Sequence, residues 1–178
     1  MRIITCVITV DGLIEAPVPK PDGWLIMDGD HEQPQLQMFT DAAAMLLGRK
    51  SYEGFAAVWP TMAGPWADRL NSMPKYVASK TLDGPLTWNA SLIKGDLVEG
   101  VKRLKSELDG DLMVSGSGTF ARFLAENGLV DEVFWVHPTV QGKGDRPFLD
   151  GPPIDLTPLG VEAFDSGVAL LRYRPIAA

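Results

Sequence analysis

The run of residues 112–120 constrains the fold more than any other, because it joins an apolar stretch, a glycine-rich turn and a helix start. Residues 112–115 are typical of a short buried strand, and Gly116 and Gly118 follow directly. Glycines let a backbone approach a ligand without a Cβ, and helix N-termini attract anions. Together with Ala121, these glycines satisfy the dinucleotide pattern G-x-G-x-x-A. Any strand-to-helix turn also favours glycine, so a purely geometric explanation stays open.

Two other predicted strands also end in residues that are suited to binding phosphate. In open α/β sheets ligands gather at the carboxyl ends of the strands, so we predict that these turns face one cleft. A single helix N-terminus stabilises an anion by only about 0.3–1 kcal/mol at an exposed site, so convergence is needed for affinity. The residues suited to phosphate are Gly48, Arg49, Lys50 and Ser51; Ser79 and Lys80; and Gly116, Ser117, Gly118 and Thr119.

Strands and helices alternate along the chain, which predicts an α/β fold. We expect strands over 2–10, 45–47, 75–79, 86–88, 112–115, 131–138 and 168–173, and helices over 33–44, 52–57, 66–70, 96–108 and 119–127. Short crossovers favour a mostly parallel central sheet with helices on both faces, a three-layer arrangement. The last two strands have no helix between them, which predicts an antiparallel C-terminal edge. Residues 1–178 are expected to form a single domain.

Composition excludes several classes of protein. The formal net charge of −7 argues against general nucleic-acid binding, which needs a basic face. Cys6 is the only cysteine and the two histidines, His31 and His137, lie far apart in the sequence, so we expect no metal cluster. No apolar run reaches the ~18 residues needed to span a bilayer, and no secretory signal is recognisable. We therefore expect a cytoplasmic protein that binds neither membranes nor nucleic acid.

The position of the glycine turn is wrong for an ordinary Rossmann domain. There the turn follows the first strand, and an acid about 20 residues later binds the ribose. Here the turn comes late, and Asp131 and Glu132 open the next strand. Basic residues at the other two turns suit a cofactor with an additional phosphate, which favours NADPH over NADH.

A set of motifs in order along the chain resembles the dihydrofolate reductase superfamily. Its closest branch is the reductase domain of bacterial riboflavin biosynthesis, the RibD C-terminal type, with its stand-alone relatives. The motifs are TVDGLI at 9–14, LGRKSYE at 47–53, VASK at 77–80, GSGTF at 116–120, and VDE at 130–132 running to HP at 137–138 and GKG at 142–144. This resemblance implies a dihydrofolate reductase-like fold.

The resemblance also implies a cofactor site and a reaction. Arg49, Lys50 and Ser51, next to Gly48, would hold cofactor phosphates, and Ser79 and Lys80 would approach the 2′-phosphate of NADPH. The turn Gly116, Ser117, Gly118, Thr119 and Phe120 would receive the pyrophosphate, while Val7 and Ile14 would border the nicotinamide. The implied reaction is hydride transfer to a small heterocyclic or pyrimidine-like substrate, of the 5-amino-6-ribosylamino-uracil type in riboflavin biosynthesis.

The substrate half departs from the superfamily. Dihydrofolate reductases carry an acid on the first helix, four residues before a phenylalanine; counting back from Phe39 gives Gln35, which is no acid. Folate reduction is therefore the weaker alternative. Asp28 and Glu32 are candidate catalytic residues near that helix start, and Asp30 lies between them. Acids before a helix are also typical caps or dipole partners.

Two tryptophans are candidates for substrate binding. Trp24, in a proline-rich loop over 13–29 that resembles a lid, and Trp59 could each stack on a flat heterocycle or simply anchor a loop. A second hypothesis is a nucleotide-binding module of the same fold without catalysis, which the missing acid favours. A homodimer through the apolar strand 133–136 is a further expectation.

Overall fold

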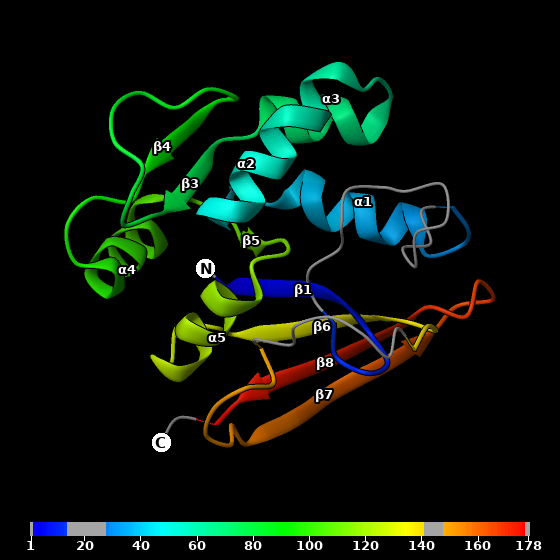
Figure 1. The fold of residues 1–178 in the computed structure, drawn as a ribbon. Coiled ribbons are helices and arrows are strands. Elements are labelled where there is room, and N and C mark those ends of the chain that lie inside the picture. Colours follow the sequence, from blue (N-terminus) through cyan, green and yellow to red (C-terminus); the bar gives the residue numbers. More distant parts are fainter. Residues whose placement is uncertain (1, 14–27, 141–147, 177–178) are drawn as a thin grey trace.

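The computed structural model describes residues 2–13, 28–140 and 148–176, which build one eight-stranded sheet flanked by helices (Figure 1). The strand order is β4-β3-β2-β5-β1-β6-β8-β7. The strands are β1 (Ile3–Thr9), β2 (Ala44–Gly48), β3 (Lys75–Ala78), β4 (Ala90–Leu92), β5 (Leu112–Val114), β6 (Glu132–His137), β7 (Leu156–Ala163) and β8 (Ala169–Pro175). The helices are α1 (Glu32–Asp41), α2 (Arg49–Val58), α3 (Pro65–Ser72), α4 (Leu97–Glu107) and α5 (Gly118–Glu126), with a 3-10 turn η1 (Trp59–Thr61).

The direction of the strands confirms the predicted mixed sheet. The strands from β4 to β6 in the sheet order pair in parallel, whereas β8 pairs antiparallel with both β6 and β7. Most parallel crossovers contain a helix, as the alternating pattern requires. The carboxyl ends of the parallel strands consequently share one edge of the sheet.

The strand expected to support a dimer lies inside the sheet. The backbone of β6 pairs with β1 on one side and with β8 on the other. A second copy of the chain would therefore have to contact side chains of β6, since the sheet already uses both edges of this strand. The homodimer stays a prediction.

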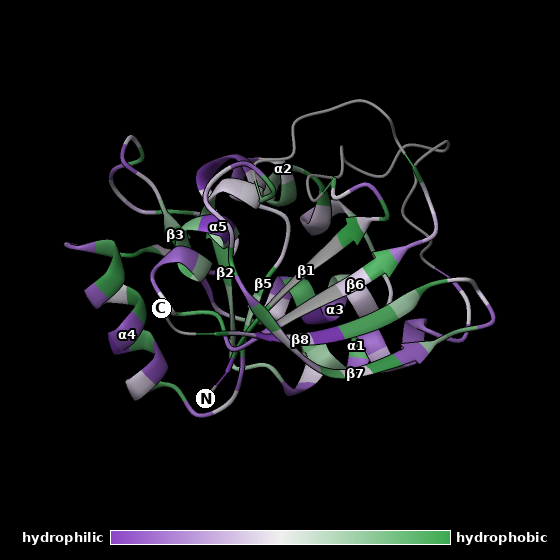
Figure 2. Ribbon diagram, turned by 90° about the horizontal axis from the view of Figure 1, so that it is seen from below, coloured by the Kyte–Doolittle hydropathy of each residue, from purple (hydrophilic) through white to green (hydrophobic). Residues whose placement is uncertain are grey.

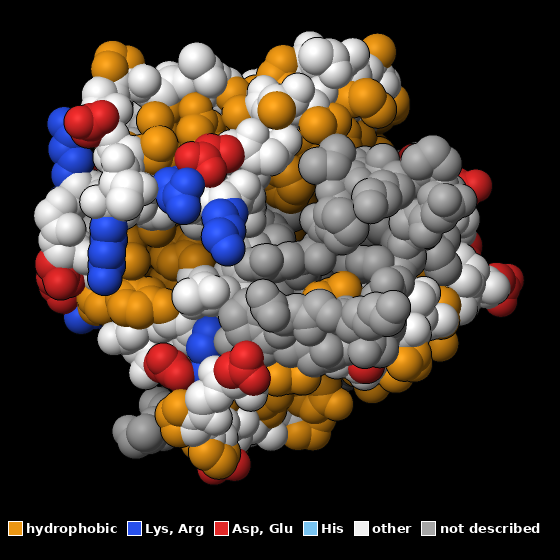
Figure 3. Space-filling model, viewed as in Figure 1, with side chains coloured by type: hydrophobic (Ala, Val, Ile, Leu, Met, Phe, Trp, Pro, Cys, Tyr) orange, Lys and Arg blue, Asp and Glu red, His pale blue; other side chains and the backbone are white. Residues whose placement is uncertain are grey.

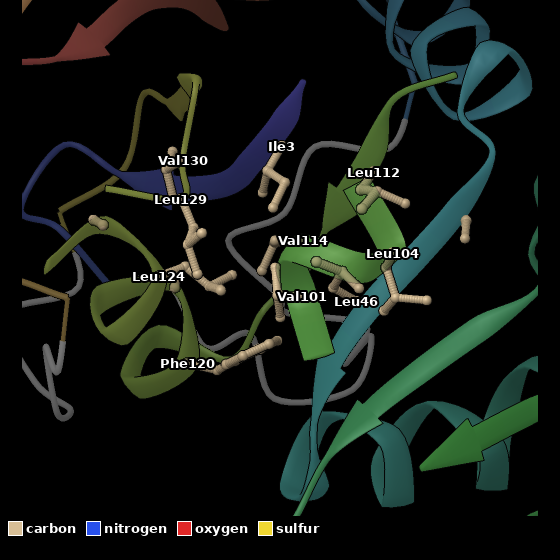
Figure 4. Close-up of a cluster of buried hydrophobic side chains, with 13 residues drawn as sticks. Ile3, Leu46, Val101, Leu104, Leu112, Val114, Phe120, Leu124, Leu129 and Val130 are labelled. Atoms are coloured by element: carbon tan, nitrogen blue, oxygen red, sulfur yellow. The ribbon is translucent and has the colours of Figure 1, made fainter. Parts of the chain in front are cut away.

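Two apolar cores cover the two faces of the sheet, because successive residues of a strand point to opposite sides. One core joins the strands to α4 and α5, and its side chains converge in Figure 4: Ile3, Leu46, Val101, Leu104, Leu112, Val114, Phe120, Leu124, Leu129 and Val130. The other joins the alternate strand residues to α1, α2 and α3: Ile4, Phe39, Met45, Leu47, Tyr52, Leu70, Val77 and Met113. This confirms the helices on both faces.

Helix α4 shows how sequence pattern becomes packing. Val101 and Leu104 are buried, and charged residues occupy the outer side, so hydrophilic and hydrophobic colours alternate along it in Figure 2. The carboxylate of Asp96 accepts a hydrogen bond from the backbone N–H of Glu99 at 3.0 Å, so Asp96 is the N-cap of this helix.

The strand predicted over 86–88 is wrong. Trp88 and Asn89 have φ values of 58° and 50°, in the left-handed region that a strand cannot use. The strand of this region, β4, begins at Ala90 instead. Trp88 places its ring over the ammonium group of Lys75, 4.1 Å from the ring centroid, and its indole N–H donates to Asn71.

The sequence does not predict strand β7, because the region between 138 and 168 is rich in Gly and Pro and indicates a long loop. β7 is the outer strand of an antiparallel pair with β8, and its register shifts between Pro158 and Gly160. All of its residues are exposed, so it has no buried face to give a period-2 pattern. Proline and a bulge are common in such edge strands.

Candidate functional site

The three turns predicted to bind phosphate follow neighbouring strands. β2 lies between β3 and β5 in the sheet, and all three are parallel. Gly48 lies opposite Ala78, the residue before Ser79, and Leu46 lies opposite Val114. The turns after these strands therefore start at a similar level of the same edge, as the convergence argument requires.

Two serines join the first and third turns directly. The hydroxyl of Ser117 accepts a hydrogen bond from the backbone N–H of Gly48 at 2.8 Å and donates to the hydroxyl of Ser51 at 2.6 Å. Ser117 is buried, with 5% of its surface exposed, and precedes α5, while Ser51 lies in the first turn of α2. The N-termini of α2 and α5 are thus held side by side.

The glycines of these turns let the two turns pack closely against each other. A Cβ on Gly116, which has φ +61°, would lie 3.2 Å from the Ser51 oxygen; on Gly48 it would lie 3.3 Å from the Ser117 oxygen. The first-turn N–H groups of both helices have no intrahelical acceptor. Close backbone approach and two helix N-termini fit the phosphates of a dinucleotide, so these residues are suited to the implied cofactor.

Basic side chains border these turns. Figure 3 shows Lys and Arg side chains over the area where α2 and β3 lie in Figure 1. The Arg49 guanidinium is 3.0 Å from the Glu53 carboxylate, and both side chains are more than a third exposed. Such an exposed pair one helical turn apart contributes only about 0.3–0.5 kcal/mol. Arg49 can therefore exchange Glu53 for a phosphate at little cost. Lys50 and Lys80 are exposed.

The remaining residues of the predicted turns have mixed environments. The Ser79 hydroxyl accepts hydrogen bonds from the backbone N–H groups of Thr81 and Leu82, so it shapes its own turn. Gly118 is buried at the start of α5 and Thr119 is exposed. Phe120 packs in the α4 and α5 core. A structural role for Phe120 is thus established, whereas its contact with a cofactor stays a prediction.

The predicted nicotinamide border is only partly described. Val7 lies in β1 and pairs with Trp135 of β6 in parallel register. The side chain of Val7, together with Ile14, Trp24, most of the predicted lid and the GKG motif at 142–144, lies outside the described part of the chain. The roles of these residues stay predictions.

The three acidic residues near the start of α1 have different environments in the structure. Asp28 is exposed and Glu32 is half-buried in the first turn of α1. The Asp30 carboxylate accepts hydrogen bonds from the backbone N–H groups of Asp165 at 2.6 Å and Ser166 at 3.1 Å. Desolvation raises the pKa of Asp30, but these hydrogen bonds outweigh it and lower the pKa below its ordinary value. Asp30 thus ties α1 to the β7–β8 turn.

Aromatic and amide residues beside α1 are part of the packing. Gln35 and Phe39 are both buried on α1. Trp59 packs partly against the core beneath α1, α2 and α3, and its carbonyl accepts a hydrogen bond from Asn71. These contacts give Trp59 the anchoring role that its sequence context allows, and a second role in substrate binding stays a prediction.

A cavity of about 330 Å³ lies at the opposite edge of the sheet, near the amino ends of β1 and β6. Four of its five charged residues form ion pairs: Glu132 pairs with Arg2 at 3.0 Å and with Arg172 at 2.8 Å, and Asp111 also pairs with Arg2. The fifth, Asp41, accepts a hydrogen bond from Gln37. None of the described residues that line it is a glycine or belongs to a first helical turn. The turns at the carboxyl edge are therefore the stronger candidate site for a phosphate-bearing ligand.

Two kinds of feature are missing from the described residues. Within 2–13, 28–140 and 148–176, no three His, Cys, Asp or Glu side chains are grouped so that they can hold a metal ion. In the same ranges, no helix has the length and apolar character to cross a membrane.

A mostly parallel sheet with glycine turns and helix N-termini at its carboxyl edge is typical of α/β proteins that bind phosphate-bearing ligands. The chain belongs to the RibD C-terminal domain family, whose model matches residues 2–170. The uncharacterized protein YyaP of Bacillus subtilis (strain 168) is 30% identical over 183 residues, covering 97% of this chain and 93% of YyaP.

Solved structures confirm the dihydrofolate reductase-like fold. A putative riboflavin biosynthesis protein from Shewanella sp. PV-4 superimposes with a TM-score of 0.72 at 20% identity, over 99% of this chain and 100% of that one. Dihydrofolate reductase from Enterococcus faecalis, complexed with NADP(H) and RAB-propyl, has a TM-score of 0.61 at 12% identity, over 98% and 96%. At these identities the likeness concerns the fold.

Proposed function

We propose that the protein is an NADPH-dependent reductase that transfers a hydride to a small heterocyclic substrate of the pyrimidine type. The observation that carries this proposal is the joining of the 48–51 and 116–119 turns through Ser117 and Ser51 at the carboxyl edge of the sheet. Family membership and the NADP(H) complex of the Enterococcus relative support the cofactor. The riboflavin-related relative supports the substrate class.

In this proposal the residues of the chain bind the cofactor and orient it. The α2 and α5 N-termini and Ser51 hold the pyrophosphate, and Arg49, Lys50 and Lys80 neutralise phosphate charge. The cofactor supplies the hydride, so the protein needs no covalent nucleophile. Asp28 and Glu32 remain the proposed acids near the substrate, since Asp30 is occupied with the β7–β8 turn.

Replacing Arg49 by alanine is expected to weaken NADPH binding about 10-fold while changing NADH binding by less than about threefold, because in this proposal Arg49 joins Lys80 in neutralising the additional 2′-phosphate. Tryptophan fluorescence during titration with each cofactor measures both affinities. Arg103→Ala is a matched control: Arg103 lies on α4 and has the same spacing to Glu107, with both side chains exposed. Equal losses for NADPH and NADH would contradict the 2′-phosphate pocket.

A second candidate function is a nucleotide-binding module without catalysis, which Gln35 favours because this buried amide on α1 supplies no acid. Incubating NADPH with pyrimidine ribosylamines, pteridines and quinones, and following the absorbance of the reduced nicotinamide, separates the two. Turnover of any compound above the enzyme-free rate excludes the inert module. NADPH binding without turnover of any compound would favour it.

A further inference from the structure

The two serines that join the phosphate turns form a hydrogen-bond chain with a defined direction. A backbone N–H can only donate, so the Gly48 N–H uses a lone pair of the Ser117 oxygen. The Ser117 hydroxyl then donates its only hydrogen to Ser51 at 2.6 Å. Ser51 is therefore an acceptor toward Ser117 and keeps its own hydrogen for another acceptor.

That remaining hydrogen has no acceptor within hydrogen-bond distance among the residues that the structure describes. Ser51 is half-buried in the first turn of α2, and its oxygen lies 3.2 Å from where a Cβ on Gly116 would be. The hydroxyl thus lies between the two glycine turns, beside the first-turn N–H groups of α2. An anion at this position would receive all of these donors together.

The backbone conformation of Ser117 is energetically unfavourable for a residue with a Cβ, and the hydrogen bonds of its hydroxyl explain why a serine is found there. Its φ of 61° and ψ of 49° place a non-glycine residue in the left-handed region, between two glycines. Glycine would adopt this conformation without a Cβ penalty. A hydroxyl at a position that favours glycine, buried and engaged on both sides, indicates that the side chain itself is required there.

We propose that Ser117 is a positioning residue that orients the Ser51 hydroxyl as a hydrogen-bond donor to the diphosphate of the bound nucleotide. This inference rests on the proposed function for the identity of the nucleotide, but its chemistry needs only a diphosphate. Ser51 contacts the ligand, and Ser117 acts through Ser51. Neither residue contacts a 2′-phosphate, because in this proposal the basic side chains bind that phosphate.

The test measures affinities by isothermal titration calorimetry for NADPH, for ADP, and for adenosine 2′-monophosphate, which lacks the diphosphate. Ser51→Ala is expected to weaken NADPH and ADP about 10- to 100-fold, as for loss of a hydrogen bond to a charged group. Ser117→Gly, which also relieves the backbone, is expected to weaken them about 3- to 10-fold. Adenosine 2′-monophosphate should change by less than about twofold for both variants.

The double variant Ser51→Ala/Ser117→Gly separates positioning from a purely structural bond between the turns. If Ser117 acts through Ser51, the double variant binds NADPH and ADP no more weakly than Ser51→Ala alone, a non-additive result. Ser106→Ala, an exposed serine on α4 that bonds its own helix, is the control and should bind like the wild type. Thermal unfolding of every variant checks that each is folded.

Three results would overturn the inference: unchanged ADP affinity in Ser51→Ala, equal losses from Ser117→Gly with and without Ser51, or equal losses for adenosine 2′-monophosphate. Failure of the proposed function looks different. In that case the wild type binds ADP with the predicted dependence on both serines, but NADPH binds no more tightly than ADP and supports no reduction.

Discussion

Replacing Leu46 by alanine is expected to lower the free energy of unfolding by about 3 kcal/mol, within the range for leucine truncation in a core. Leu46 is completely buried in β2, two residues before the Gly48 turn, and packs in the core of α4 and α5. Its neighbours in the sheet are Tyr76 of β3 and Val114 of β5, so the cavity would open beneath the candidate site. Urea unfolding followed by circular dichroism measures the change.

Leu159→Ala provides the matched control, because Leu159 lies in the outer strand β7 and is 37% exposed. Removing the same atoms there should cost less than about 1 kcal/mol. If Leu46→Ala cost no more than Leu159→Ala, the assignment of β2 to the centre of the fold would be wrong.

Lowering the pH from 7 to 4 is expected to remove about 3 kcal/mol of stability through His137 alone. Burial lowers the pKa of His137 from 6.5 to about 4, and the nearby charge of His31 adds to this shift. The centroids of the His31 and His137 rings are 6.0 Å apart, and both residues are completely buried. Because the folded-state pKa is below the unfolded one, the unfolded chain binds the proton first, and stability falls between pH 6.5 and about 4.

The imidazole proton resonances of His137 test this directly by NMR, where a midpoint near pH 4 is expected. His137→Gln cannot be protonated in this range, so its free energy of unfolding should fall by about 3 kcal/mol less than that of the wild type over the same pH interval. A His137 midpoint near the ordinary value, with parallel pH profiles for the two proteins, would contradict the account.

Much of the parallel sheet is predictable because its strands are buried on both faces. The runs at 45–47 and 112–115 are continuously apolar or nearly so, and the corresponding strands β2 and β5 are buried between the two helical layers. The same reasoning fails for β7, whose residues are exposed and include Pro158 and Gly160. An edge strand lacks the burial that makes a pattern readable.

Local patterns mislead where a distant residue decides the structure. Trp88 resembles part of a strand in sequence, yet it covers Lys75, which is 1% exposed. Burial lowers the pKa of Lys75 to about 8, and Arg69 adds to this shift. Lys75 is buried because of its place in β3, and no local pattern around Trp88 reveals that its ring covers this ammonium group.

The candidate site is predictable as a set of turns but not as a network. Parallel strands end at one edge, so the turns at 48–51 and 116–119 are expected to lie near each other. The bond between Ser117 and Ser51 spans 66 residues and depends on β2 and β5 being neighbours, which the strand order alone decides. The Arg49 and Glu53 pair is visible in principle from its four-residue spacing.

A crystal structure with NADPH bound would show directly whether the joined turns form a cofactor site. We expect pyrophosphate oxygens within hydrogen-bond distance of the Ser51 hydroxyl and of the first-turn N–H groups of α2 and α5, with Ser117 still bonded to Gly48. NADPH bound instead in the cavity between Arg2, Glu132 and Arg172, or bound with its pyrophosphate away from both turns, would contradict this expectation.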